Sequence, residues 1–474
     1  MDDLRKNYRP WDAQQNCQEL VSPRDALPEG DLVFFLIDTV ASLNLSAFHH
    51  YYARELRGQP PFDVTMMVTL LMYAYAVGVC SSRKIASACE RNLAFLALVG
   101  KDPPDFRTIS DFRKIHAAAF RPLFVEVLRL AGEMGMVKLG NLSTDGTKMR
   151  ANASRHKAMS YGYMDKELKR LEAEVDELLK KAEQIDAEQD AALGSRRGDE
   201  LPVELKRRED RLAKIREAKA RLEAEARAEG EEEQRHRNAQ QAEREAQGHK
   251  RRGKEPAPVK MTPEDKTQTN FTDPEAKIMK QSNKGFDYSY NAQSVVDREN
   301  QIIVAAEVTQ QANDKQQGVP MGRAALDNLA VAGIEVPKGA DDKPLPIPNT
   351  ADTGYFSEKA IEVLETMGLD PHIAVGRQKH HEVSVPEVEE KAAIAATATA
   401  KEKMRRKLNS VSGKLLYAAR KHIVEPVFGQ IKAVRGIRKF LLRGLEKVSA
   451  EWQLICLTHN ILKIWRRCGG VAPS

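Results

Sequence analysis

Apolar positions recur at helical spacing through residues 31–136. The repeat runs through four stretches, DLVFFLIDTVASL, FDVTMMVTLLMYAYAVG, SSRKIASACERNLAFLALVG and TISDFRKIHAAAFRPLFVEVLRLAGEMG. Side chains three and four positions apart share one face of a helix, so each stretch can bury one side. Ser81–Ser82 and Thr108–Ser110 are expected to cap two of these helices. The pattern predicts a helical domain over 31–138, preceded by a loosely ordered segment at 1–30.

A second pattern fills residues 161–260, where Glu, Lys, Arg and Ala dominate and aromatic residues become rare. Apolar residues keep a spacing of three and four on both sides of GSRRGDELP. They are Leu171, Val175, Leu178, Ala182 and Ile185 before it, and Leu205, Leu212, Ile215 and Leu222 after it. This spacing predicts an antiparallel helical hairpin or coiled coil, with a single long solvated helix as the alternative. Globular patterning resumes afterwards, so the segment is an insertion.

Around the insertion, strand-like and helix-like stretches alternate. A first strand is expected within 141–149, ending at Asp145. Strands at 283–297 and 301–310 follow, joined by a short turn. Then come a helix at 314–333, a strand ending near Asp352, a helix starting after Ser357, a strand at 371–376, a loop at 377–410, a basic helix at 414–443 and a helix at 445–467. This order predicts a mixed α/β sheet with helices on its faces, built from 139–160 and 261–467.

Composition narrows the class of protein. The chain has 474 residues, of which 42% are apolar and 30% charged, and a formal net charge of +6. No apolar run reaches the roughly 18 residues of a membrane span, and the first residues are too polar for a signal peptide. The cysteines show no metal-binding spacing, which is typical of reduced thiols. We therefore expect a cytoplasmic protein of several domains that does not contact a membrane.

Three acids stand out against this background. Asp145 ends the first predicted strand and Asp352 lies at the end of a later one, and ligands gather at the carboxyl ends of strands in such sheets. Two carboxylates on neighbouring strands can share a metal ion. Glu425 is one of only two acids among the many cations between Lys401 and Arg443. Such a set suits two Mg²⁺ ions, which prefer oxygen ligands and can promote phosphoryl transfer.

Basic residues gather in two places and are expected to contact DNA phosphates. In the N-terminal helices, a helix-turn-helix-like unit would use Arg83, Lys84, Arg113 and Lys114. The alternative is an ordinary helical bundle whose basic residues are solvated. In the late helices, the stripe consists of Arg420, Lys421, Lys432, Arg435, Arg438, Lys439 and Arg443. Because Pro426 suits the first turn of a helix, Glu425 should lie at a helix start or a kink.

Five motifs in fixed order resemble a known family. DGTKMRANAS, DPEAKIMK, YNAQSVVD, ADTGYFSE and HIVEPVFGQIK with RKFLLRGLEKV are similar to the DDE transposases of bacterial insertion sequences, in the IS1182-like group related to IS4 and IS5. The resemblance covers most of residues 45–465. It implies an RNase H-like catalytic domain. It also implies that Asp145, Asp352 and Glu425 are the catalytic acids and hold two Mg²⁺ ions, with Mn²⁺ as a substitute.

The resemblance also implies partners and further contacts. Its terminal signature places Tyr417 and Arg420 before Glu425 and Lys432 after it. Arg420 precedes Glu425 by five positions where the IS4 pattern has four, which leaves open whether Arg420 or Lys421 contacts phosphate. The implied partners are double-stranded DNA, as terminal inverted repeats and target, and a second copy in a homodimeric synaptic complex. The implied location is the bacterial cytoplasm, at the nucleoid when bound to DNA.

The function expected is metal-dependent cleavage at the ends of an insertion sequence and strand transfer into target DNA. Two alternatives use the same chain: a catalytically inactive DNA-binding protein derived from a transposase, and a nuclease that cuts without joining. Each acid also has a structural interpretation, as a turn residue for Asp145 and Asp352 and as a helix-start acid for Glu425. Trp452 is expected in the core.

Overall fold

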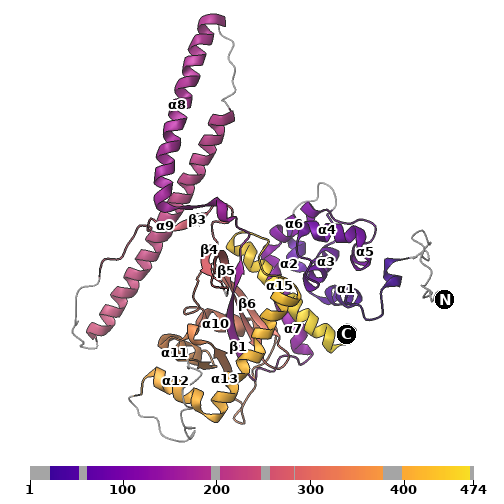
Figure 1. The fold of residues 1–474 in the computed structure, drawn as a ribbon. Coiled ribbons are helices and arrows are strands. Elements are labelled where there is room, and N and C mark those ends of the chain that lie inside the picture. Colours follow the sequence, from indigo (N-terminus) through magenta and orange to yellow (C-terminus); the bar gives the residue numbers. More distant parts are fainter. Residues whose placement is uncertain are drawn as a thin grey trace, which may run out of the picture.

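The computed structural model describes six ranges of the chain. They are residues 22–52, 61–193, 203–246, 257–281, 283–376 and 398–469. Within them, the predicted combination of an N-terminal helical region and a mixed α/β sheet is confirmed (Figure 1). Most of the segment 1–30 lies outside the described residues, and so does GSRRGDELP in the insertion.

The predicted loop at 377–410 is wrong in its last part. Residues 377–397 lie outside the described residues, but Ala400–Asn409 forms the helix α12. Thr399 accepts a hydrogen bond from the amide of Glu402, and the Glu402 side chain accepts one from the amide of Thr399. This reciprocal capping box is a helix-start signal that the neighbouring Ala/Thr-rich stretch obscured.

Helices make up the N-terminal region. They are α1 (Leu32–Ser42), α2 (Ser46–Tyr52), α3 (Val64–Ala76), α4 (Ser82–Arg91), α5 (Leu93–Val99), α6 (Phe106–Ile115) and α7 (Phe120–Glu133). Within the described ranges no single helix is long and apolar enough to cross a membrane, although the bent pair α1 and α2 together meets the length and composition required.

The predicted helix caps are only partly correct. Ser81 does precede α4, but its side chain makes no capping hydrogen bond. Asp105, rather than Thr108–Ser110, caps α6, and its carboxylate accepts from the Thr108 amide at 2.6 Å. A carboxylate caps a helix as well as a hydroxyl does, so the sequence offered two competing starts three residues apart.

The sheet is built around β1 (Leu142–Arg150). On one side β1 pairs antiparallel with β5 (Phe286–Asp297), and on the other it pairs parallel with β7 (Ile347–Ala351). The remaining strands are β8 (Leu369–Ile373), parallel to β7, and β4 (Lys277–Lys280) and β6 (Ile303–Thr309), both antiparallel to β5. The order is β4–β5–β1–β7–β8, with β6 also on β5.

The prediction that the first strand ends at Asp145 is wrong. β1 continues to Arg150, because its antiparallel pairing with β5 extends as far as Arg150 and Ser289. Its parallel pairing with β7 stops at Thr144 and Ala351. Asp145 is therefore inside the strand but at the point where one neighbour ends.

Helices cover the sheet and join it to the N-terminal region. They are α10 (Gly318–Val331), α11 (Glu358–Thr366), α12, α13 (Val411–Ile423), α14 (Glu425–Gly429), a π-helical turn (Gln430–Val434) and α15 (Leu445–Arg467). α15 packs against β6 and against α3 and α7, so one continuous hydrophobic core runs from the helices to the sheet (Figure 1). Trp452 is fully buried there, as predicted, and its indole donates to the Gln293 carbonyl at 3.0 Å.

The insertion consists of two helices that pack side by side, α8 (Tyr161–Leu193) and α9 (Val203–Ala246), and project from the body (Figure 1). They run antiparallel, because residues later in α8 pair with residues earlier in α9: Asp165 pairs with Lys219, whereas Glu174 pairs with Arg208. Leu171, Leu212, Ile215 and Leu222 are buried between them, as their spacing predicted. The single-helix alternative is thereby excluded.

Candidate active site

Asp145 in β1 and Asp352, directly after β7, lie at the same level of the sheet. Each directly follows one member of the last parallel pair, Thr144 of β1 and Ala351 of β7. Neighbouring strands are about 4.8 Å apart, so the two side chains begin close together. Their charges interact, since Asp352 contributes to raising the pKa of Asp145. The structure thus brings together two of the three predicted acids.

Asp145 sits in an environment that opposes its negative charge. Its side chain is only 19% exposed, and burial raises its pKa from 3.8 to about 6. Arg420 acts against this shift, with Nη1 3.2 Å from Asp145 Oδ2, and the Gly146 amide donates to Oδ1 at 2.8 Å. Asp352 and Asp314 add to the rise. A group of carboxylates that repel one another is a typical cation-binding environment.

Asp352 also has the local role that its sequence context suggested. Its Oδ1 accepts from the Gly354 amide at 2.8 Å and so caps the 3₁₀ turn Thr353–Tyr355. The turn interpretation is therefore correct for this oxygen. It does not conflict with a role in the site, because a carboxylate has a second oxygen.

Residues 411–440 run alongside β1 in the same direction. Leu416 accepts through its carbonyl from the Asn141 amide group, Arg420 pairs with Asp145, and Lys432 Nζ donates to Thr147 Oγ1 at 2.5 Å and to the Lys148 carbonyl at 2.9 Å. Burial and the nearby Lys148 lower the pKa of Lys432 to about 8. This path places two cations of the predicted stripe against the strand that carries Asp145.

Arg420 and Tyr417 belong to this group, whereas Lys421 does not. The Arg420 guanidinium lies 6.0 Å from the centroid of the Tyr417 ring. Burial raises the pKa of Tyr417, and the charges of Asp352 and Asp145 add to the rise. Lys421 is exposed on α13. Of the two cations left open by the sequence, Arg420 is therefore the one that faces the aspartates.

Glu425 does not join Asp145 and Asp352 in a cluster of three acids. It is the first residue of α14, with Pro426 in the first turn as predicted, and its side chain is exposed. Along the chain it lies between Arg420, which pairs with Asp145, and Lys432, which donates to Thr147. Among the described ranges, however, no three His, Cys, Asp or Glu side chains converge closely enough to hold a metal ion.

Two predicted DNA contacts are wrong, because their guanidinium groups are buried. Arg113 is 4% exposed and donates to the Tyr75 hydroxyl at 2.7 Å and to the Cys80 carbonyl at 2.9 Å. Arg435 is 6% exposed and donates to the Ile455 carbonyl and to the Thr458 hydroxyl. Both side chains make hydrogen bonds to a neighbouring helix inside the core, where no phosphate can reach them.

The other predicted contacts are on the surface. Arg83, Lys84 and Lys114 in the N-terminal helices are exposed, as are Arg438, Lys439 and Arg443 after the π-helical turn. Two of them are held in place by backbone carbonyls: Arg438 donates to Lys432, and Arg443 donates to Asn152.

Sequence reasoning missed a polar group beside the aspartates. Asp314, in the loop after β6, accepts from Asn291 Nδ2 at 2.6 Å and from Gln293 Nε2 at 2.7 Å, and it lies 3.6 Å from Lys148 Nζ. Gln293 in turn accepts a short hydrogen bond from the Tyr355 hydroxyl. The available signal was a pair of amide side chains two positions apart in an otherwise apolar strand, YNAQSVV.

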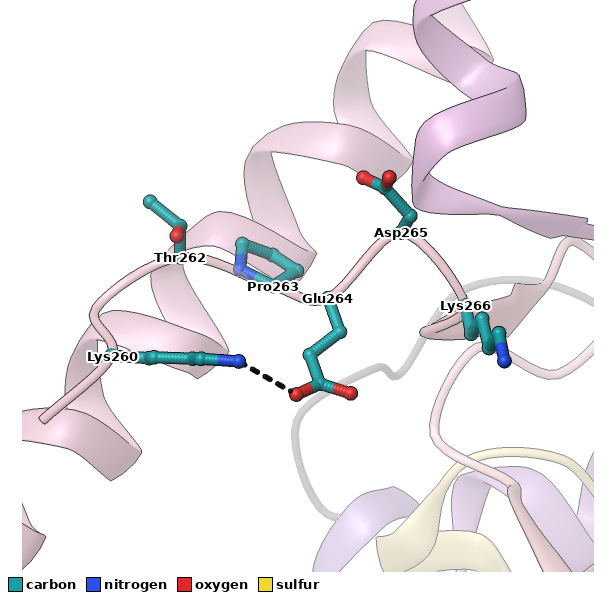
Figure 2. A pocket seen from close by; sticks show the side chains of 6 residues that line it. All are labelled: Lys260, Thr262, Pro263, Glu264, Asp265 and Lys266. Atoms are coloured by element: carbon teal, nitrogen blue, oxygen red, sulfur yellow. Dashed lines mark hydrogen bonds and ion pairs between the residues drawn. The ribbon is translucent and has the colours of Figure 1, made fainter. Parts of the chain in front are cut away.

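A surface hollow in the segment after α9 is separate from the group around Asp145 and Asp352. Figure 2 shows its lining, Lys260, Thr262, Pro263, Glu264, Asp265 and Lys266. Its one ion pair joins Lys260 Nζ and Glu264 Oε1 at 3.0 Å, and both side chains are mostly exposed. Exposed pairs of this kind contribute little free energy, and the hollow contains none of the residues predicted to act on DNA.

Comparisons with known proteins identify two segments of the chain. Residues 387–465 match the family model described as Transposase DDE domain. Residues 21–115 match the model described as Transposase domain (DUF772). No curated protein and no solved structure matches the chain. The first segment contains Glu425, Arg420 and Lys432, whereas Asp145 and Asp352 lie outside both matched segments.

Proposed function

We propose that this chain, a transposase by the two domain families it carries, cleaves DNA at the ends of an insertion sequence and joins the freed 3′-hydroxyls to target DNA. The observation that carries the proposal is the pair Asp145 and Asp352 at one level of adjacent parallel strands, with Arg420 against it. The matched DDE segment contains Glu425, which we propose as the third acid.

We propose an RNase H-like fold for the catalytic domain, formed by 139–160 and 261–467. A mixed sheet whose central strand carries Asp145, and whose parallel neighbour presents Asp352 just after its last residue, supports this fold. The remaining division is a segment at 1–30, a DNA-binding helical domain at 31–138 and the insertion at 161–260. The insertion is proposed to be a coiled-coil hairpin that mediates contacts between copies.

Transposases with DDE domains are generally dependent on divalent metal ions, and the aspartate pair fits such an ion. Its donors are carboxylate oxygens, the ligands that Mg²⁺ prefers. Burial raises the pKa of Asp145, and the negative charges of Asp352 and Asp314 add to the rise, so a bound cation would favour the ionised form. Asp145 and Asp352 would hold the metal. We propose Glu425, which is apart from the two aspartates in this structure, as the third ligand. Two bound Mg²⁺ ions, or Mn²⁺ in their place, supply activation of the attacking oxygen and stabilisation of the leaving one.

The cations of this chain would orient the DNA. Arg420 partly neutralises Asp145 and is close enough to contact a phosphate presented to the pair. Lys432 is held against β1, and Arg438, Lys439 and Arg443 extend an exposed basic stripe from it. Phosphate contacts of this kind fix the register of a duplex without reading its sequence.

Recognition of the terminal inverted repeats is assigned to the N-terminal helices. Arg83, Lys84 and Lys114 are exposed there and can reach phosphates. Because both element ends must be cut and joined together, we propose that a homodimer acts in the synaptic complex. We place the protein in the cytoplasm, at the nucleoid when bound to DNA.

The test uses DNA that flanks the chain's own gene, chosen to include both element ends. Asp145→Asn, Asp352→Asn and Glu425→Gln should each lower strand cleavage in Mg²⁺ by at least about 100-fold, since even the loss of a group that only supports a metal ligand costs about 10- to 100-fold. Binding to the end DNA should stay close to that of the wild type. Asp327→Asn, at an exposed acid of α10, is the matched control.

Each outcome decides between functions. Wild-type cleavage by any of the three variants would remove that acid from the site. Tight DNA binding by the wild type without nicking in Mg²⁺ or Mn²⁺ would identify an inactive derivative. Cleavage without joining, tested with a pre-cleaved end, would identify a nuclease.

A further inference from the structure

Asp314 is the centre of a hydrogen-bonded group that reaches both the backbone beside Asp145 and the turn beside Asp352. Asn291 and Gln293 are two positions apart in β5 and so project from the same face of the sheet. Both donate to the same oxygen, Asp314 Oδ1, at 2.6 and 2.7 Å. Asp314 comes from the loop between β6 and α10 and is 22% exposed. Two amide donors on one carboxylate oxygen hold this loop against the strand.

The group continues from Asp314 to the turn that holds Asp352. A carboxylate only accepts hydrogen bonds, so the Gln293 side chain must present its NH₂ to Asp314. This turns Gln293 Oε1 away, where the Tyr355 hydroxyl donates to it. Tyr355 is fully buried and ends the 3₁₀ turn that Asp352 caps. The negative charge of Asp314 thus fixes the orientation of the Gln293 amide, and through it the hydrogen bond to Tyr355, which lies three residues after Asp352. These two hydrogen bonds form a relay from Asp314 to Tyr355.

The same group lies against the backbone next to Asp145. In β1, Gly146 is paired with Gln293 of β5. A Cβ on Gly146 would lie 2.2 Å from Gln293 Nε2 and 2.8 Å from Asp314 Oδ1. A side chain there would displace Gln293 and Asp314 from their hydrogen bond, which accounts for glycine directly after the first aspartate. One cluster therefore touches β1 beside Asp145 and the turn beside Asp352.

We propose that Asp314 is a positioning residue for the aspartate pair, acting through Gln293 and Tyr355 on the turn of Asp352 and by direct packing on Gly146. The inference rests on the proposed function, because it assigns Asp314 to the same site. In this role Asp314 acts through its neighbours rather than on the DNA. It maintains the separation of the two carboxylates that must share a divalent ion.

The experiment measures Mn²⁺ binding to the full chain by titration calorimetry without DNA, alongside cleavage. Tyr355→Phe removes only the hydroxyl at the end of the relay, and Asp314→Asn removes its charge. Tyr161→Phe, whose hydroxyl donates to Glu223 in the insertion, is the matched control. Each site variant should weaken Mn²⁺ binding by about 10-fold or more, the scale found when supports of a metal ligand are removed.

The double variant distinguishes positioning from general damage. If both residues act along one path, Asp314→Asn with Tyr355→Phe should be no worse than the more severe single variant, since coupled residues are not additive. Affinity for end DNA and the urea midpoint of Tyr355→Phe should remain close to wild type. Wild-type Mn²⁺ affinity in Tyr355→Phe, or fully additive losses, would overturn the inference. A wild-type protein that neither binds Mn²⁺ nor nicks DNA would instead overturn the proposed function.

Discussion

Replacement of Asp145 by asparagine should make the metal-free protein more stable at neutral pH. Burial and the neighbouring Asp352 and Asp314 raise the pKa of Asp145 from 3.8 to about 6, even with Arg420 opposing them. Each pKa unit corresponds to about 1.4 kcal/mol, so the ionised carboxylate costs the folded state up to about 3 kcal/mol. Asparagine has nearly the same shape without the charge. We expect a gain of roughly 1–3 kcal/mol, with the lower part of the range reflecting solvent screening.

The pH dependence follows from the sign of the shift. Since the folded pKa lies above the unfolded one, protonated Asp145 contributes stability that is fully present below pH about 4 and is lost as pH rises through about 6. The advantage of Asp145→Asn should therefore be greatest at pH 7.5 and vanish near pH 4. Divalent ions should reverse it, because a ligand that binds only the folded wild type stabilises that form alone.

The assay is urea unfolding in EDTA and in Mg²⁺, followed by tryptophan fluorescence, since Trp452 packs beside the sheet. Asp327→Asn, at an exposed acid, should change stability by less than about 0.5 kcal/mol under every condition. If Asp145→Asn proves less stable than wild type at pH 7.5 in EDTA, Arg420 holds the carboxylate favourably. Burial and the neighbouring aspartates would then not raise the pKa of Asp145 above its ordinary value.

Other substitutions separate structural from DNA-binding residues. Arg435→Met should lower stability by about 2–4 kcal/mol, because buried hydrogen bonds to carbonyls are lost, and should leave the salt dependence of DNA binding unchanged. Arg438→Met should do the opposite, reducing the salt slope by about 1 at constant stability. Gly146→Ala should destabilise by about 1–3 kcal/mol in urea unfolding, because its Cβ would displace Gln293 and Asp314 from their hydrogen bond. Arg420→Ala should raise the pKa of Asp145 further, so that Mn²⁺ binding in calorimetry needs a higher pH.

The elements and the aspartate pair were accessible to sequence reasoning because local patterns encode them. Asp352 directly follows β7, and Asp145 follows the last residue of β1 that pairs with β7, so the expectation that acids at strand ends lie together held although β1 continues past Asp145. Arg113 and Arg435 could not be judged in this way. A basic residue on a helix has the same local pattern whether it faces water or the carbonyls of a distant helix.

Asp314 was hidden for a related reason. The role of Asp314 depends on the register that brings Gln293 opposite Gly146. Register is a property of two paired strands and cannot be read from the sequence of one. Glu425 shows the reverse case. Its motif and its place at a helix start were recognised from the sequence. Its distance from the aspartates depends on how α13, α14 and the π-helical turn pack beside β1. The Thr399–Glu402 capping box, by contrast, was a local signal that could have been used.

The most direct test of the account is a change of metal preference at Asp352. In Asp352→Cys a sulfur replaces an oxygen ligand, and sulfur is a poor ligand for Mg²⁺ but acceptable to softer ions. Cleavage of end DNA by this variant should fall by at least about 100-fold in Mg²⁺ and recover substantially in Mn²⁺, while the wild type works in both. Full activity of Asp352→Cys in Mg²⁺ would contradict a metal-binding role for Asp352.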